Sequence, residues 1–280
     1  MTAPRARAFA QVDVFSEQPL RGNPVAVVLD AEGLADETMA AFARWTNLSE
    51  TTFLFPGGPD ADYRWRVFTP ERELPFAGHP TLGSAHAWLE HGGTPRTDGR
   101  VIQDCAAGLV ELRVADGRVA FAAPPTVRSG PVEEELLTRV ARCLGVDRAE
   151  ILDHQWVDNG PGWLAVRLAS AARVLELRPD FGAEPALMVG VLGDHPAGVP
   201  HRYEIRGFAV GAGIAEDPVT GSLNASVAQW LIRTGQAPSS YTATQGARLS
   251  RAGVVHIEAD GDTIWVGGAC TTVVRGTVTL

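Results

Sequence analysis

The chain has 280 residues, with 24 basic and 33 acidic side chains and a formal net charge of -9 at pH 7. A surface with this balance repels polyphosphates and anionic lipids, so we expect neither a nucleic acid nor a membrane as a partner. All 24 basic residues are arginines, and the lack of lysine excludes a lysine Schiff base and the lysine of a phosphate-binding P-loop.

Most predicted elements in the chain are strands. Short apolar or alternating runs predict strands at Phe9–Phe15, Pro24–Leu29, Thr51–Phe55, Tyr63–Phe68, Gly108–Val114 and Val119–Ala122. Helical spacing of apolar residues predicts helices over Leu34–Trp45 and Pro131–Leu144. The double proline Pro124-Pro125 interrupts this pattern, and we place the boundary between two halves there.

The two halves contain a similar segment. His79-Pro80-Thr81-Leu82-Gly83-Ser84 aligns with Asp217-Pro218-Val219-Thr220-Gly221-Ser222 at a constant offset of 138 residues. The strands predicted before the two segments begin alike, with Tyr63 and Tyr203, and a hairpin with an Asp-Gly turn follows each segment. Three matches in the same order predict a duplicated α+β unit.

Both Pro-x-x-Gly-Ser turns are predicted to lead into helices, Ser84–Glu90 and Ser222–Arg233. A helix amino terminus presents unpaired backbone N–H groups, and glycine lets a ligand approach that backbone closely. Two such ends that face each other suit a small carboxylate. At equivalent positions of the repeat, His79 and Asp217 suit proton transfer at two points of one substrate. The alternative is that all these residues are helix caps and turn residues.

Glu50 is a third candidate for acid/base chemistry. It directly precedes the apolar strand predicted at Thr51–Phe55, so its carboxyl group is expected at a partly dry edge. Desolvation there raises the pKa of a carboxyl group toward the range of a general acid/base. A solvated carboxylate at a strand end is the alternative.

The chain shows no pattern of a metal or redox site. Cys105, Cys143 and Cys270 form no CxxC pair, and the histidines lack metal-ligand spacing, so we expect neither a metal nor a cofactor. Met1–Ala10 lacks the apolar run of a signal peptide, and no stretch approaches the ~20 apolar residues of a membrane span. We therefore expect a cytoplasmic protein with reduced thiols.

Four segments resemble motifs of the PhzF-like phenazine-biosynthesis family: Gly22–Val28, Ser49–Thr51, Phe76–Gly83 and Glu216–Ser222. The resemblance implies an α+β fold related to diaminopimelate epimerase. This fold has two pseudo-symmetric halves, each a curled, mostly antiparallel sheet around a central helix, with the active site between them. The expected halves are residues 1–123 and 124–270, with a closing strand, 271–280, that pairs with the first half. We also expect a homodimer.

The resemblance assigns roles residue by residue. Glu50 resembles the residue that takes and returns the proton, and His79 and Asp217 resemble its acid/base and hydrogen-bonding helpers. The expected substrate-binding residues are Gly78, Gly221, Ser222, Gln245 and Gly246. Arg251 resembles the family's arginine after the Gln-Gly motif, but it stands in Ser-Arg-Ala where the family often has Gly-Arg-Pro, so the contacts of that loop are not carried over.

The best-known member of that family isomerises trans-2,3-dihydro-3-hydroxyanthranilate without a cofactor. The resemblance therefore implies an isomerase that moves a proton within a small unsaturated or cyclic amino or hydroxy acid, in secondary metabolism such as antibiotic biosynthesis. An amino-acid racemase or epimerase with carboxylate and histidine bases stays open, as does a non-catalytic protein that binds small carboxylates. The epimerase relatives use two cysteines, and neither Pro-x-x-Gly-Ser turn contains one, which disfavours two-thiol racemisation.

Overall fold

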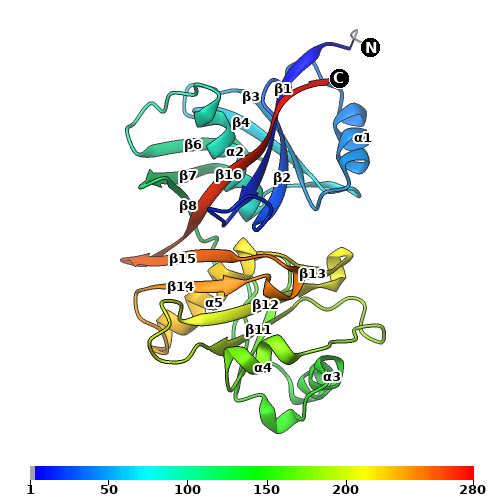
Figure 1. Ribbon diagram of the computed structural model, residues 1–280, viewed down its shortest axis with the longest axis vertical. Coiled ribbons are helices and arrows are strands. Elements are labelled where there is room, and N and C mark those ends of the chain that lie inside the picture. Colours follow the sequence, from blue (N-terminus) through cyan, green and yellow to red (C-terminus); the bar gives the residue numbers. More distant parts are fainter. Residues whose placement is uncertain (1–3) are drawn as a thin grey trace. The chain divides into compact units, whose positions relative to one another are not determined.

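The computed structural model describes residues 4–280, which form two compact units (Figure 1). Unit 1 runs to Ala122 and also contains Gly267–Leu280, and unit 2 is Ala123–Val266. The long strand β16 (Thr263–Thr279) therefore begins in unit 2 and ends in unit 1. The chain passes from unit 1 to unit 2 after Ala122, one residue before the boundary predicted at the double proline. It returns to unit 1 at Gly267, four residues before the start of the predicted closing strand.

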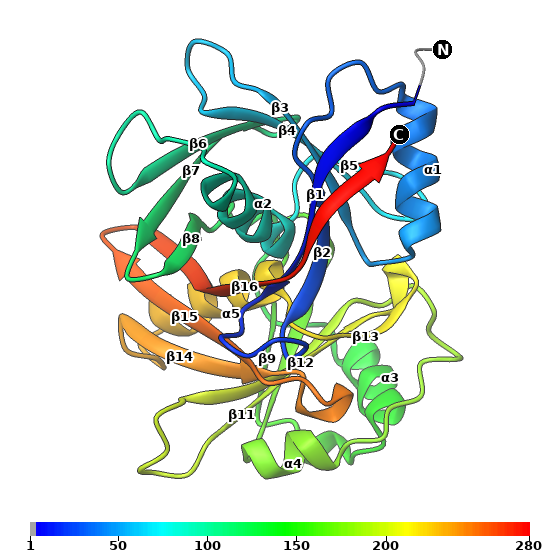
Figure 2. The same ribbon diagram turned by 45° about the horizontal axis from the view of Figure 1, so that its top comes forward.

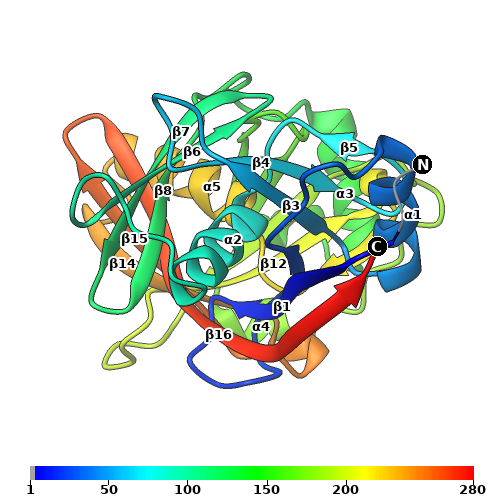
Figure 3. The same cartoon turned by 90° about the horizontal axis from the view of Figure 1, so that it is seen from above.

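Unit 1 is a ring of strands around one helix. Its strands are β1 (Ala6–Val14), β2 (Asn23–Val28), β3 (Thr51–Pro56), β4 (Tyr63–Phe68), β5 (Glu73–Leu74), β6 (Arg100–Cys105), β7 (Gly108–Ala115) and β8 (Arg118–Ala122). Its helices are α1 (Asp36–Thr46) and α2 (Gly78–Glu90). The strands follow the order β1-β2-β3-β4-β6-β7-β8-β16, and β16 also pairs with β1, which closes the ring around α2 (Figure 3).

The helix α2 lies inside this ring and has no solvated face. Nine of its 13 residues are buried, so most of the helix is covered by the strands around it. A Cβ atom added to Gly83 would lie 2.4 Å from the side chain of Val25, so α2 packs directly on β2. The amphipathic helix α1 instead covers the outer face of β3 and β4, where Met39 and Phe42 pack with Phe53.

Unit 2 repeats this plan as an open sheet. Its strands are β9 (Asp153–Trp156), β10 (Leu164–Leu168), β11 (Val189–Asp194), β12 (Tyr203–Ala209), β13 (Ile214–Asp217), β14 (Ser240–Gln245), β15 (Gly253–Asp260) and the start of β16. Its helices are α3 (Glu134–Leu144), α4 (Ala171–Glu176) and α5 (Gly221–Arg233), with single turns of 3-10 helix at Arg148–Glu150, Val210–Ala212 and Ala247–Leu249. On β11, Gly190 contacts Leu223 of α5, whereas Val189 and Val191 pack with α3 and α4 on the other face (Figure 2).

The strand pairings confirm the duplication that the sequence predicts. In unit 1, β1 pairs antiparallel with β2, β2 parallel with β3, β3 antiparallel with β4, β4 parallel with β6 and β6 antiparallel with β7. In unit 2, β9, β10, β11, β12, β14 and β15 show the same sequence of pairings. The short strands β5 and β13 occupy corresponding places beside β4 and β12. The helices α2 and α5 therefore correspond, and each has 13 residues.

The register predicted for the repeat is wrong at the helices. The first residues of α2 and α5, Gly78 and Gly221, are 143 residues apart, whereas the sequence alignment has an offset of 138. His79 is therefore the counterpart of Ser222, and Asp217 ends β13 before the helix begins. The Pro-x-x-Gly-Ser residues recur in different local structures: inside the first two turns of α2, but across the turn that leads into the first two residues of α5. Pro80 is accommodated because the first turn of a helix does not need its N–H group.

The last strand of the chain pairs with the first. β16 pairs antiparallel with β1 from Ala6 opposite Thr279 to Val14 opposite Cys270. The Asp116-Gly117 hairpin also forms, with both residues at positive φ, as a two-residue turn of this type requires. Within residues 4–280, no helix is long and apolar enough to cross a membrane.

Candidate active site

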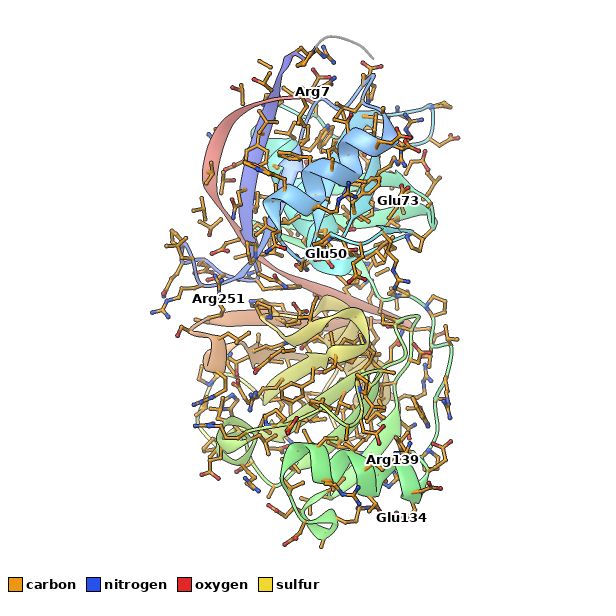
Figure 4. The ribbon with its side chains drawn as sticks, turned by 90° about the vertical axis from the view of Figure 1, so that its right-hand side faces the viewer. Arg7, Glu50, Glu73, Glu134, Arg139 and Arg251 are labelled. Carbon is orange, nitrogen blue, oxygen red and sulfur yellow. The ribbon has the colours of Figure 1, made fainter. Side chains whose placement is uncertain are left out.

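Glu50 stands at a sharp change of direction between α1 and β3. The helix ends at Asn47, which adopts the left-handed conformation with a φ of 53°. The hydroxyl groups of Thr46 and Thr51 lie 2.9 Å apart and join the helix end to the strand start. This places Glu50 directly before the buried strand, beyond one end of α1 (Figure 4).

The carboxyl group of Glu50 is desolvated, although the side chain as a whole is not fully buried. Its side chain is 14% exposed, and burial raises its pKa from 4.5 to about 7, against the opposing effect of a hydrogen bond from Ser49. Its Oε2 atom has no hydrogen bond within residues 4–280 and lies 3.5 Å from Nε2 of His79. A carboxyl group with a pKa near neutrality can both accept and return a proton. The raised pKa predicted for Glu50 is confirmed.

His79 is the second residue of α2, and its ring is held from β2. The side-chain amide nitrogen of Asn23 lies 3.4 Å from Nδ1 of His79. An amide nitrogen can only donate, so Nδ1 is the acceptor, and a neutral ring then carries its proton on Nε2. That proton faces the carboxyl group of Glu50. The contact with Asn23 thus favours the tautomer in which Nε2 of His79 carries the proton on the side of Glu50.

Asp217 belongs to a compact network of polar side chains in unit 2. Its Oδ2 atom accepts a hydrogen bond from the Thr220 hydroxyl group at 2.7 Å. That hydroxyl accepts from Nε2 of Gln245 at 2.9 Å, and the same nitrogen donates to the Asp217 carbonyl at 3.0 Å. Oε1 of Gln245 accepts from the Thr220 N–H group at 3.0 Å and from the Asn224 side-chain amide at 2.9 Å. The direction of every bond in this network is therefore determined.

Gln245 and Gly246 support the turn between β13 and α5. Both donors and both acceptor positions of the Gln245 amide are used within the protein, which leaves no side-chain atom for the substrate contact that we predicted. Gly246 has a φ of 97°, and a Cβ atom there would lie 2.6 Å from the carbonyl oxygen of Pro218. Arg251 closes the same turn through its N–H group, which donates to the Gly246 carbonyl at 3.0 Å.

The two serines of the repeat have different environments. Ser84 lies in the second turn of α2 and is fully buried; its hydroxyl accepts from Trp65 and donates to Thr52. The prediction that both Pro-x-x-Gly-Ser turns end at helix amino termini is therefore wrong for Ser84. Ser222 is the second residue of α5 and is only partly buried. The first residues of the two helices, Gly78 and Gly221, carry N–H groups that have no partner within a helix.

Sequence reasoning missed the residues that hold these groups in place. Asn23 lies in the Gly22–Val28 segment, to which the sequence assigns no site role, whereas in the structure it begins β2 and reaches His79. Thr220 was considered only as a helix cap, and its role depends on Gln245, which is distant in the sequence. Within residues 4–280, no cluster of three or more His, Cys, Asp and Glu side chains has an arrangement that could hold a metal ion.

Comparisons with known proteins identify the family of the chain. Residues 12–276 match the PhzC-PhzF family, described as phenazine biosynthesis-like protein. The chain is 36% identical to "Antisense-enhancing sequence 1" of Schizosaccharomyces pombe, over 96% of this chain and 97% of that protein. It is 34% identical to trans-2,3-dihydro-3-hydroxyanthranilate isomerase of Pseudomonas aeruginosa, over 90% of both chains. The crystal structure of a PhzF-family protein from Enterococcus faecalis superimposes with a TM-score of 0.83 at 26% identity, over 99% of this chain and 100% of that one.

Proposed function

Because the chain belongs to the phenazine biosynthesis-like family and is an isomerase, we propose that it moves a proton within a small unsaturated or cyclic amino or hydroxy acid without a cofactor. The carboxyl group of Glu50 removes a proton from carbon and returns it at another position of the same substrate. The observation that carries this proposal is the position of Glu50, partly exposed, with a pKa of about 7 and 3.5 Å from Nε2 of His79.

His79 is proposed as the helper of Glu50. With Nδ1 facing Asn23, the Nε2 proton can stabilise the carboxylate form of Glu50 or a negatively charged oxygen or nitrogen of the substrate. Asp217, whose Oδ2 atom accepts a hydrogen bond from Thr220, is the second proposed helper. These roles need positioned groups with suitable pKa values, and such catalysis typically contributes about 10²–10⁴-fold to the rate.

The carboxylate of the substrate is proposed to bind the amino-terminal end of α5. The N–H groups of Gly221 and Ser222 and the Ser222 hydroxyl are its proposed donors. In unit 1, the N–H group of Gly78 at the start of α2 is a separate proposed substrate contact. Backbone N–H groups and the positive end of the helix dipole both favour an anion at such a place. Gly221 has no side chain that would obstruct the approach of the ligand.

Incubation in heavy water tests the reaction class. A panel of acids, with trans-2,3-dihydro-3-hydroxyanthranilate and saturated α-amino acids among them, is incubated with the protein, and deuterium is located by NMR. The proposal predicts deuterium at an allylic or vinylic carbon of an unsaturated acid, with a shifted double bond. Deuterium at the α-carbon of a saturated amino acid, with inversion, would instead indicate a racemase or epimerase. No incorporation into any acid would favour the non-catalytic binding protein.

The wider context is also a proposal. The likeness to the Pseudomonas aeruginosa isomerase supports a substrate similar to trans-2,3-dihydro-3-hydroxyanthranilate and a place in secondary metabolism such as antibiotic biosynthesis. The resemblance of the motifs supports a homodimer and a cytoplasmic location. Sedimentation of the purified protein tests the homodimer, and deletion of the gene with metabolite profiling tests the pathway.

A further inference from the structure

Two side chains from one loop of unit 2 hold Ser222. The indole Nε1 of Trp163 donates to the Ser222 hydroxyl oxygen at 3.0 Å, and the side-chain amide of Asn159 donates to the Ser222 carbonyl at 3.0 Å. Both residues lie in the connection between β9 and β10. Ser222 is therefore fixed through its side chain and its backbone at the second position of α5.

The loop that presents these two donors is itself rigid. Oδ1 of Asp158 accepts hydrogen bonds from the N–H groups of Gly160 and Gly162, both at 2.7 Å. The N–H group of Val157 donates to the carbonyl of Trp163 at 3.0 Å, which closes the loop, and the Trp163 side chain is buried. Such a loop holds its donors in place before a ligand arrives, which lowers the entropic cost of binding.

The duplication gives this contact a counterpart in unit 1. Asn23, the first residue of β2, reaches Nδ1 of His79, the second residue of α2. Trp163 directly precedes β10, the counterpart of β2, and reaches Ser222, the second residue of α5. In each unit, a donor at the start of the second strand orients the side chain at the second position of the central helix.

The hydrogen bonds determine where the Ser222 proton points. An indole N–H group can only donate, so the Ser222 oxygen is the acceptor in that contact. Within residues 4–280, no acceptor for the Ser222 hydroxyl proton is present among the hydrogen bonds of the protein. Ser84 is the contrasting case, because it accepts from Trp65 but donates its own proton to Thr52. Of these two serines, only Ser222 keeps a proton for a ligand.

We propose that Trp163 is a positioning residue that directs the hydroxyl proton of Ser222 toward the carboxylate of the substrate. The inference rests on the proposed function, in which the substrate carboxylate binds at Gly221 and Ser222. A second feature points to a ligand here: Oδ1 of Asn159 is buried without a hydrogen-bond donor within residues 4–280, and such an acceptor is costly unless a donor reaches it. A substrate that carries an amino or hydroxyl group beside its carboxylate supplies that donor.

Binding of 2-aminobenzoate, measured by calorimetry, tests this role without any turnover. Trp163→Phe removes the indole N–H group, and we expect about tenfold weaker binding, as for the loss of one hydrogen bond to a charged group. The neutral 2-aminobenzamide should bind the variant and the parent equally. In a Ser222→Ala background, Trp163→Phe should weaken 2-aminobenzoate binding no further, because Trp163 acts through the serine hydroxyl.

Trp65→Phe is the matched control, since it removes the same N–H donor from Ser84, whose proton is used inside the protein. It should leave 2-aminobenzoate binding unchanged. If Trp163→Phe does not fold, benzothienylalanine at position 163 keeps the ring shape and still removes the donor. Unchanged binding in the folded variant, an equal loss for the benzamide, or a parent protein that does not prefer the carboxylate would each overturn the proposal. Failure of the proposed proton transfer would appear separately, as absent deuterium incorporation with carboxylate binding intact.

Discussion

Nε2 of His79 lies 3.5 Å from Oε2 of Glu50, and Asn23 approaches the opposite ring nitrogen at 3.4 Å. This relationship places a proton donor against a desolvated carboxyl group within unit 1. It does not require the second unit, because all three side chains come from β2, the start of β3 and the first turn of α2. The acid/base pair is therefore a property of the first half of the duplicated fold.

The pH dependence of the reaction should follow Glu50. The carboxyl group must be ionised to accept a proton, and burial raises its pKa to about 7. The kcat/KM value should therefore rise as the pH increases through about 7 and level off above it. Glu204 in unit 2 also has a pKa of about 7, so Glu204→Gln is a matched control that should keep the rising limb. A flat profile between pH 5 and pH 9 would exclude Glu50 as the base.

Removal of the Thr220 hydroxyl should impair turnover more than folding. Thr220→Val keeps the branched shape but loses the donor to Asp217, and Gln245 loses one acceptor. We expect a stability loss of about 1–2 kcal/mol, since a typical buried hydrogen bond contributes roughly that amount. Because Asp217 then loses the hydrogen bond that orients its Oδ2 atom, kcat should fall by about tenfold or more. Thr220→Ser, which restores the hydroxyl, should recover most of the activity; equal activity of the Val variant and the parent would refute the role of the network.

The chain should become less stable as the pH rises from 5 to 8 because of Glu204. Burial raises the pKa of this carboxyl group from 4.5 to about 7, with Thr244 and Arg206 opposing the shift. Between these values the folded state binds the proton more strongly than the unfolded state, so stability is lost as the pH rises through this window and the loss is complete above about pH 7.

Glu204→Gln removes the ionisation that causes this loss. Above pH 7 the variant should be more stable than the parent by about 1–2 kcal/mol, and below pH 5 the gain should disappear. Urea unfolding at several pH values measures the difference. If the difference in unfolding free energy between the two proteins does not change with pH, ionisation of Glu204 does not cause the loss of stability.

A branched side chain at the start of α5 should block carboxylate binding. Gly221→Val places a side chain beside the N–H groups proposed to hold the substrate, and 2-aminobenzoate binding should weaken by roughly tenfold or more. Gly58→Val is the control, because a Cβ atom at Gly58 meets no other atom within 4 Å and the residue lies elsewhere in unit 1. Undiminished binding by a folded Gly221→Val protein would remove this end of α5 from the proposed site.

The residues that chemistry requires were easier to predict than those that hold them. Glu50 was recognisable because an acidic residue directly precedes an apolar strand, and its raised pKa follows from that position. The duplication was also recognisable, but its register was not, because Pro-x-x-Gly-Ser is helical throughout in α2, whereas its second copy forms a turn and the first two residues of α5. His79 and Asp217 therefore do not correspond.

The supporting contacts depend on the folded sheet. Gln245 reaches Thr220 because β14 lies beside β12, and Trp163 reaches Ser222 because the β9–β10 loop packs on α5. Local propensity and hydrophobic spacing carry no information about such pairs. The strands β5, β6, β9–β11, β13 and β14 and the helix α4 were not predicted for a related reason: they are short, and local apolar runs alone do not distinguish a strand from a buried helix.

The most direct measurement of the central claim is deuterium incorporation by Glu50→Gln. The amide keeps the shape of the side chain but cannot accept a proton, so the variant should bind 2-aminobenzoate like the parent while its exchange rate falls by about 10²–10⁴-fold. Glu204→Gln, the same change at the other carboxyl group with a raised pKa, should exchange at the parent rate. A Glu50→Gln protein that exchanges deuterium at a near-parent rate would contradict the assignment of Glu50 as the proton carrier.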